Sequence, residues 1–361
     1  WGDWWAVADR AMVAPYRHHV SSQIAMPQPT VTMLGADGPL LLAGRPPAGL
    51  SPVAGDVRFS ARRHLAPGRP RRRIRLDEIG YSRRQAEGFP GPVALAGPFR
   101  LLSEEGVRTA GRIIRRLARE RRLAPDLPSL IRGGVYRSRF LDGLCASPEV
   151  TAHVSHMLHC AVAPHPLLLN RAHTNLAPDD AALGRDRWHA GSVPFVIMLA
   201  IAEPADDHAD DFQVWRGRVA DGLARLAAGK PLTAGRREST GLVRPGFAIA
   251  MQGPAILHWI RDISRVPGRI TLVNCYVPAD PAAVDRTELA GLQATDPDML
   301  LLPEYARMTA RQTARRLDQV ADQIRAGQPA ADLARTLAAS RDGLDRAIAQ
   351  LTKAKARGRK I

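Results

Sequence analysis

The feature that most constrains the fold of this chain is a series of short apolar segments between residues 167 and 277. They are rich in β-branched residues, and glycine and proline turns separate them. In order, they cover residues 167–170, 193–201, 212–215, 246–251 and 269–277. Short strands separated by such turns are typical of two packed antiparallel sheets. This part of the chain is therefore predicted to be a β-rich core.

Segments with helical spacing flank the β-rich core. Apolar residues recur at helical spacing between Val107 and Leu117, behind Ser103, which is a predicted N-cap followed by two glutamates. Ser147 before Pro148 predicts a second cap and helix, and residues 219–228 predict a helix between strands. From residue 305 onward, two apolar helical patterns separated by a Gly-Gln-Pro turn predict an antiparallel helical hairpin.

The predicted fold class is α+β, with a double-stranded β-helix core. This jelly-roll, cupin-like core carries flanking helices and a C-terminal helical hairpin. We expect three regions: an N-terminal extension over 1–78 with no assigned role, the jelly-roll domain over 79–289, and the hairpin over 290–361.

The charge and cysteine content limit the partners and the compartment. The net charge is +16, and arginine supplies almost all of it. Either coding bias or an acidic partner, such as a phosphate, a carboxylate or a carrier-tethered substrate, explains this excess. No nucleic-acid-binding signature is present, so we do not expect nucleic acid. Three scattered cysteines predict a reducing, cytoplasmic setting, and no apolar run reaches the about 18 residues of a membrane span.

Two histidines and an arginine in the β-rich region carry the chemistry. His189 and His258 stand on strand-like segments, and Arg269 follows the second histidine by eleven residues. Mononuclear iron that activates dioxygen needs few protein ligands, because O2 and a cosubstrate also bind the metal. A guanidinium can hold the carboxylate of an acidic cosubstrate through a bidentate pair. The pattern predicts a metal site with an acidic cosubstrate beside it.

In order and spacing, these residues resemble the Fe(II)/2-oxoglutarate oxygenases, and within them the phytanoyl-CoA dioxygenase-like group. The resemblance spans roughly Ile79 to Val277. It implies Fe(II), 2-oxoglutarate and O2 as cofactors, with His189 and His258 as metal ligands and Arg269 on the distal carboxylate of 2-oxoglutarate. Thr271, two residues beyond Arg269 and on the same strand face, is a second candidate for that carboxylate.

Gly191 departs from the family pattern. The motif of the family is His-x-Asp or His-x-Glu, and here it reads His189-Ala190-Gly191. The halogenases of the family carry Gly or Ala at this place, and a chloride or bromide ion occupies the vacated ligand position. The resemblance thus implies a halogenase that acts on an unactivated carbon, with Gly191 as the halide site. The substrate radical would take halogen in place of hydroxyl.

Three other interpretations remain open at this point. The chain can be a hydroxylase in which Gly191 replaces the metal-binding Asp. The carboxylate can instead come from His208-Ala209-Asp210, which is a literal His-x-Asp in a polar turn. Finally, the protein can be a non-catalytic jelly roll that only binds its ligand.

The remaining candidate site residues lie beside these motifs. Trp188 precedes the first histidine and Trp259 follows the second, so both are candidates for contact with substrate. Asn170, His173 and Asn175 lie on the segment that leads into the first motif; we assign Asn170 to the cofactor and the other two to the substrate. The expected partner is a small-molecule or carrier-tethered anionic substrate, and the oligomeric state is not predicted.

Overall fold

Two antiparallel sheets form the centre of the computed structural model. It describes residues 51–119, 130–176, 188–202, 212–242, 244–260, 268–281, 283, 287, 289–293, 296 and 298–354. The larger sheet has the strand order β1-β2-β9-β6-β11-β5-β3, and β4 pairs with β11. The second sheet has the order β10-β7-β8. Every strand pair in both sheets is antiparallel.

The strands of the two sheets have the following bounds. In the larger sheet they are β1 (Arg72–Arg75), β2 (Val93–Arg100), β3 (Leu130–Ile131), β4 (Val162–Pro164), β5 (His173–Leu176), β6 (Phe195–Ala202), β9 (Phe247–Met251) and β11 (Ile270–Pro278). In the second sheet they are β7 (Phe212–Trp215), β8 (Arg237–Ser239) and β10 (Leu257–Ile260).

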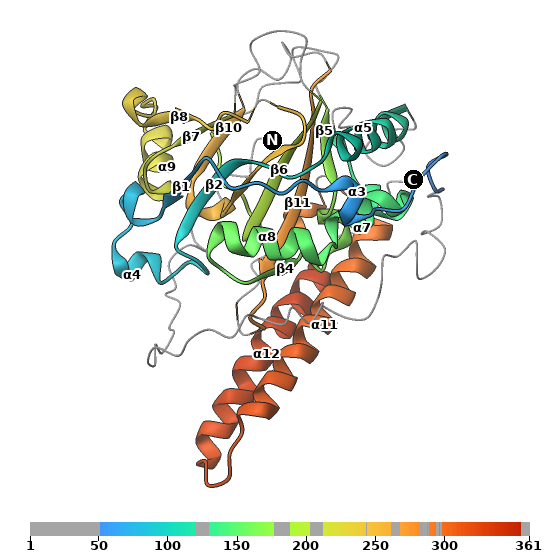
Figure 1. The fold of residues 1–361 in the computed structure, drawn as a ribbon. Coiled ribbons are helices and arrows are strands. Elements are labelled where there is room, and N and C mark those ends of the chain that lie inside the picture. Colours follow the sequence, from blue (N-terminus) through green and yellow to red (C-terminus); the bar gives the residue numbers. More distant parts are fainter. Residues whose placement is uncertain are drawn as a thin grey trace.

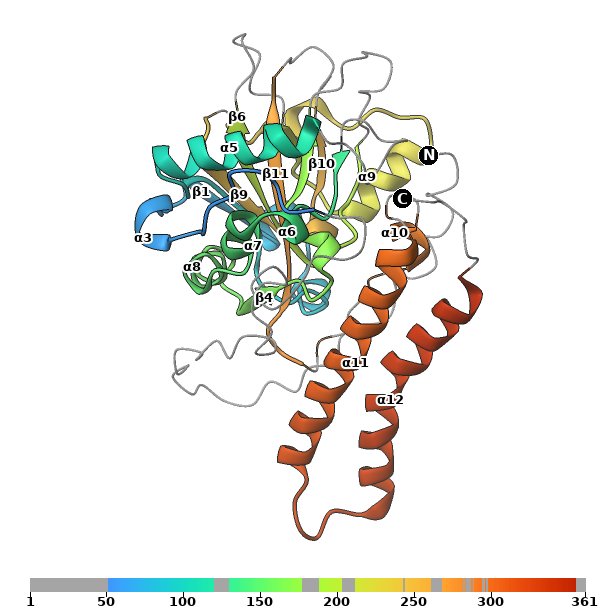
Figure 2. The same ribbon diagram turned by 90° about the vertical axis from the view of Figure 1, so that its right-hand side faces the viewer.

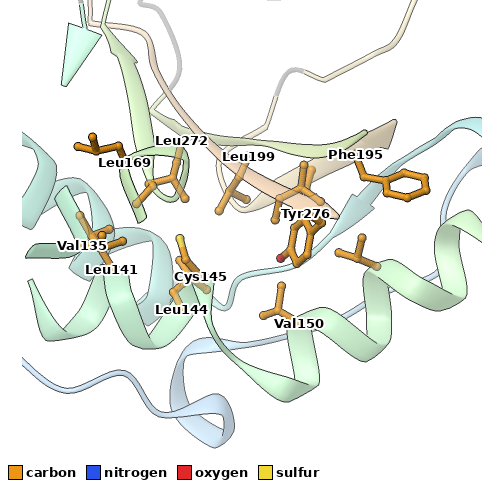
Figure 3. Close-up of a cluster of buried hydrophobic side chains, with 14 of the residues drawn as sticks. Val135, Leu141, Leu144, Cys145, Val150, Leu169, Phe195, Leu199, Leu272 and Tyr276 are labelled. Carbon is orange, nitrogen blue, oxygen red and sulfur yellow. The ribbon is translucent and has the colours of Figure 1, made fainter. Parts of the chain in front are cut away.

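Helices cover one face of the larger sheet (Figures 1 and 2). They include α5 (Glu104–Arg119), α6 (Gly134–Arg137), α7 (Arg139–Cys145) and α8 (Pro148–Leu158). The predicted caps are confirmed: Ser103 Oγ accepts from Gly106 N at 3.1 Å, and Ser147 Oγ accepts from Val150 N at 3.3 Å. Figure 3 shows the core on this side, where Leu272 and Tyr276 of β11 meet Leu144 of α7.

The opposite face of the larger sheet packs against the second sheet. Val273 and Cys275 of β11 lie in a core cluster with Phe212 and Val214 of β7. Alternate residues of β11 therefore face opposite ways, as the period of a strand requires: even-numbered residues face the helices and odd-numbered ones face the second sheet. This alternation decides which polar side chains reach the space between the sheets.

The described part of the predicted N-terminal extension joins the larger sheet. Strand β1 pairs with β2, and Val53, Ile74 and Leu76 are buried. Short elements complete the main body. They are α3 (Ala61–His64), η1 (Asp77–Ile79), α4 (Arg83–Ala86), η2 (Leu168–Asn170), α9 (Val219–Ala227), η4 (Ala234–Arg236) and η5 (Gly253–Ala255).

One of the five predicted strand segments forms a different structure. In the segment 167–170, Leu167 is the N-cap of the 3-10 helix η2 (Leu168–Asn170), and Asn170 N donates to Leu167 O at 3.0 Å. Leu167 and Leu169 are buried in the helix-side core. A short apolar run does not distinguish a strand from a buried turn of helix, so periodicity alone gave the wrong element here.

Three helices end the described chain. They are α10 (Leu289–Leu292), α11 (Asp298–Gln323) and α12 (Ala330–Lys353). Helices α11 and α12 lie side by side and extend away from the sheets (Figures 1 and 2). Only their ends nearest the sheets join the helix-side core, through Leu301, Tyr305, Met308 and Ala347. Of the helices that the structure describes, none combines the length and the hydropathy needed to cross a bilayer.

Candidate metal centre and carboxylate site

The two predicted metal-binding histidines are direct neighbours. His189 and His258 form an isolated antiparallel bridge, in which His189 N donates to His258 O at 3.1 Å and His258 N donates to His189 O at 2.9 Å. Their ring centroids are 4.3 Å apart, with 60° between the ring planes. Since directly opposite residues in an antiparallel pair point to the same side, the backbone itself holds the imidazoles together.

The surroundings of His258 fix the orientation of its ring. The side chain is buried, its Nδ1 lies 3.2 Å from the carbonyl oxygen of Ile256, and its ring packs beside Phe212 at 5.7 Å. A hydrogen bond from Nδ1 to a carbonyl selects the tautomer in which Nε2 keeps a lone pair. His258 therefore has the second contact that metal-binding imidazoles usually make.

Strand pairing places the histidines on the inner face of the second sheet. His258 lies opposite Val214, whose side chain is in the core between the two sheets. Directly opposite residues share a face, so His258 points toward the larger sheet, and His189 beside it does the same. The histidine pair therefore stands at the space between the sheets.

A row of polar residues faces the histidines from the larger sheet. On β11, Thr271 has the same parity as Val273 and Cys275, which pack toward the second sheet. Asn175 of β5 is paired with Thr271, and His173 with Val273, so both share this face. Arg269 directly precedes β11. The predicted residues Thr271, His173 and Asn175 thus come from adjacent strands and share one side, and Arg269 lies next to them in the sequence.

The two candidate tryptophans stack on each other beside the histidines. The rings of Trp188 and Trp259 have centroids 5.5 Å apart and are tilted by 34°. Both side chains are half-buried. Trp259 follows His258 on β10, so its side chain points to the opposite face of the strand. This stack supports the bridge between the histidine segments, and contact of the tryptophans with substrate stays a prediction.

Asn170 lies in a buried polar network that does not include the predicted carboxylate-binding residues. Its Oδ1 accepts a hydrogen bond from Arg132 Nη2 at 3.0 Å, and its Nδ2 lies 3.5 Å from His165 Nε2. Arg132 in turn forms a bidentate pair with Asp296, with distances of 2.8 Å and 2.6 Å. These contacts explain the position of Asn170 without any cofactor, whereas its predicted role toward 2-oxoglutarate stays a prediction.

His173 is an uncharged imidazole beside a fixed positive charge. Burial, followed by the nearby Arg132 guanidinium, lowers the pKa of His173 to about 3. The proximity follows from the sheet, because β3 pairs with β5 immediately before Arg132. A neutral imidazole can both donate and accept a hydrogen bond, so His173 offers the inter-sheet space a polar group without charge.

The place of a side chain at Gly191 is taken by the backbone of Gly253. A β-carbon on Gly191 would lie 2.9 Å from Gly253 Cα, which is closer than non-bonded carbon atoms pack. Gly191 N also donates to Gly253 O at 2.9 Å. A β-carbon on Gly253 would in turn lie 2.7 Å from Val193 O. Both positions therefore require glycine while the two segments keep this contact.

No carboxylate joins the histidines among the residues that the structure describes. Within those ranges, no group of three or more His, Cys, Asp or Glu side chains could hold a metal ion. The alternative motif His208-Ala209-Asp210 lies outside the described residues. Two adjacent imidazoles, of which His258 has its tautomer set by the Ile256 carbonyl, still suit Fe(II), which accepts imidazole ligands and leaves positions for other ligands. The donor set therefore fits a two-histidine metal centre.

Three residues of this region were not predicted from the sequence. Arg132 and Asp296 are 164 residues apart, and neither belongs to a recognisable motif. Gly253 lies between a strand and a proline, a common place for glycine. Only the three-dimensional contacts identify these residues.

Comparisons with known proteins give matches to solved structures only. No family model matches the sequence, and no curated protein matches it. SnoN, a non-heme alpha-ketoglutarate-dependent epimerase from nogalamycin biosynthesis, is 12% identical, with a TM-score of 0.37; the match covers 49% of this chain and 75% of SnoN. EctD from S. alaskensis matches in two structures.

The EctD structure with 2-oxoglutarate and 5-hydroxyectoine is 17% identical, with a TM-score of 0.36, and covers 61% of this chain and 86% of EctD. The structure with bound Fe is 19% identical, with a TM-score of 0.37, and covers 62% and 88%. The case for a function therefore rests on the residues of the site.

Proposed function

We propose that this protein is an Fe(II)/2-oxoglutarate-dependent enzyme whose two sheets form a jelly roll around the metal. The observation that carries the proposal is the backbone bridge between His189 and His258, which stands at the space between the two sheets. Two imidazoles held 4.3 Å apart by the backbone can serve as ligands of one metal ion.

Each part of the site has a task in this proposal. His189 and His258 hold the metal, while Arg269 and Thr271 hold the distal carboxylate of 2-oxoglutarate through charge-assisted and neutral hydrogen bonds. His173 and Asn175 orient the substrate from the same sheet face. When bound, iron and 2-oxoglutarate supply the activation of O2 that removes a substrate hydrogen. The stacked Trp188 and Trp259 cover the outer side of the bridge.

Within this class, we propose halogenation of an unactivated carbon in an acidic or carrier-tethered substrate. Gly191 supports halogenation over the hydroxylase alternative. Restoring an aspartate there would push its β-carbon into Gly253, so the present backbone is not that of a hydroxylase that has simply lost its carboxylate. We propose a halide as the ligand that residue 191 does not supply. Because the Gly253 backbone fills the β-carbon direction of Gly191, the halide would lie beside this contact and not in the place of a side chain.

A turnover assay tests the class of the enzyme. With Fe(II), 2-oxoglutarate and O2, we expect succinate to form, and His258→Ala to abolish it by removing a metal ligand. His156→Ala on α8 is the matched control and should keep the wild-type rate, since His156 is exposed and far from the bridge in sequence. Absence of succinate from the wild-type protein would leave the non-catalytic binding protein as the better interpretation.

A halide experiment tests the finer proposal. Anomalous scattering from crystals soaked with metal and bromide should show bromide at the metal, next to the backbone of residues 191 and 253. Bromide elsewhere only, with a water or a carboxylate from another segment at the metal, would favour hydroxylation. This outcome is independent of the identity of the substrate.

A further inference from the structure

An apolar face on the C-terminal helices has no covering element among the described residues. The exposed large apolar side chains of the described chain are Val57, Leu317 of α11 at 43%, Ile324 directly after α11 at 41%, and Leu337 and Ile348 of α12 at 51% and 52%. Three of these five side chains therefore lie on the two helices that extend away from the sheets, and a fourth lies at the end of α11 (Figures 1 and 2).

The exposed residues on α11 and α12 recur at the spacing that is typical of packing between helices. On α11, the exposed stripe recurs at steps of four and three: Ala310, Ala314, Leu317, Ala321 and Ile324. On α12, the exposed members of the corresponding stripe are Ala334, Leu337, Arg341 and Ile348, while Leu344 is half-buried and Leu351 packs against the helix-side core. Positions that recur at steps of three and four lie on one side of a helix, which is the spacing of helix-to-helix packing. On α12, Arg341 interrupts the apolar positions.

Both stripes lie on the same side of the pair. The seam between the helices contains Val320 on α11 and Ser340 and Ala347 on α12, which are buried. On each helix the stripe lies about a quarter turn beyond its seam residues, in the same rotational sense. Because the two helices run antiparallel, equal rotations bring both stripes to one side. The large aliphatic side chains thus form one broad face, while the seam uses smaller ones.

We propose that this face packs against the same face of a second copy of the chain, forming a four-helix interface. Its size suits a dimer: α12 has 24 residues and is about 36 Å long. Two adjacent helices present a width of about 18–20 Å. The face therefore offers roughly 600 Å², close to the about 800 Å² per partner of a standard interface.

The charges beside the face favour a second copy over a lipid surface. Asp318 and Asp322 lie on α11, and Arg325 follows its last turn. On α12, Arg341 within the stripe donates to Asp345. Charges of both signs allow a two-fold-related copy to pair opposite groups. An anionic bilayer would repel the aspartates, and the face contains none of the aromatic side chains typical of membrane-surface helices.

Measurement of mass in solution tests the proposal. By analytical ultracentrifugation at micromolar concentration, the full chain should have twice its own mass. Leu337→Arg on α12 and, separately, Leu317→Arg on α11 should weaken self-association by about tenfold or more, because each places a charge within the face. Ala339→Arg is the matched control on the opposite, exposed side of α12 and should remain dimeric.

Circular dichroism must show unchanged helix content, so that loss of the dimer is not loss of the fold. A wild-type protein of single-chain mass overturns the proposal, including when it sediments with anionic vesicles. So does a dimer that survives both arginine substitutions, because it must then form elsewhere. Equal dissociation by Ala339→Arg also overturns it. The proposal is independent of the activity assigned to the histidine site.

Discussion

At the scale of single residues, Gly191 and Gly253 act as a pair. Their backbones meet so closely that neither accepts a β-carbon without movement. The glycine at 191 is thus required by packing as well as by the chemistry proposed for the metal. A carboxylate at this position would need at least a shift of η5.

We expect Gly191→Ala to destabilise the fold by about 1–3 kcal/mol, as overpacking against backbone does. The free energy of unfolding from urea titration measures this. Gly235→Ala is the matched control, since nothing lies within 4 Å of a β-carbon there, and its stability should stay near wild type. If Gly191→Ala is as stable as the control, the close approach of residues 191 and 253 is not required.

Arg269 carries the second prediction at this scale. Arg269→Ala should weaken the binding of 2-oxoglutarate by roughly 2 kcal/mol or more, because a charge-assisted pair with the distal carboxylate is lost. Isothermal titration with a redox-inert divalent metal in place of iron measures this affinity. Arg83→Ala, at an exposed position on α4, should leave it unchanged. Equal affinities for both variants would remove Arg269 from the site.

At the scale of elements, the Arg132–Asp296 pair ties the C-terminal segment to the edge of the larger sheet. Asp296 precedes α11, and Arg132 follows β3. The carboxylate is fully buried and the guanidinium is 6% exposed. Because Arg132 also holds Asn170 and lies near His173, the segment before α11 and strand β5 share one buried charge pair.

Removal of one partner of the Arg132–Asp296 pair should destabilise the folded protein. Asp296→Ala is expected to lower the free energy of unfolding by about 3–5 kcal/mol, since it leaves the Arg132 guanidinium buried without its counter-charge. Asp345→Ala removes an exposed pair with Arg341 and should cost less than about 1 kcal/mol. Chemical denaturation compares the two variants, and similar losses would contradict the buried role of the pair.

The sequence predicts elements better than it predicts their contacts. The segment 212–215 forms β7 with the expected bounds, and β6, β9 and β11 each fall within two residues of the prediction, because alternation and turn residues act locally. The adjacency of His189 and His258 was an expectation from a resemblance. The network of Arg132, Asp296 and Asn170 left no periodic signal, since long-range hydrogen bonds between unlike elements impose no local pattern.

At the scale of the whole molecule, two buried groups set opposing pH dependences. The pKa of His173 is lowered to about 3, so the stability it contributes is present above the unfolded value of 6.5 and is lost as pH falls. Burial raises the pKa of the Asp142 carboxyl to about 7 from 3.8, so its contribution is present at low pH and is lost as pH rises. Between about pH 4 and 6.5 the two effects oppose each other.

Removal of the Asp142 carboxyl should leave the pH dependence of stability due to His173 unopposed. In Asp142→Asn, the carboxyl no longer titrates, so stability should rise with pH between 4 and 6.5 more steeply than in wild type, by roughly 1 kcal/mol per pH unit. Urea midpoints measured across this range check the slope. A parallel pH dependence in both proteins would show that Asp142 titrates normally in the folded state.

The bridge between His189 and His258 has a thermodynamic consequence for the whole chain. Folding itself brings the two imidazoles to 4.3 Å, so an ion that needs both of them binds the folded state and finds no equivalent partner in the unfolded one. Binding and folding are then linked: the melting temperature must rise with the concentration of free divalent ion, and must cease to do so in His189→Ala. Thermal melting thus reports the affinity of the centre without substrate, cosubstrate or turnover.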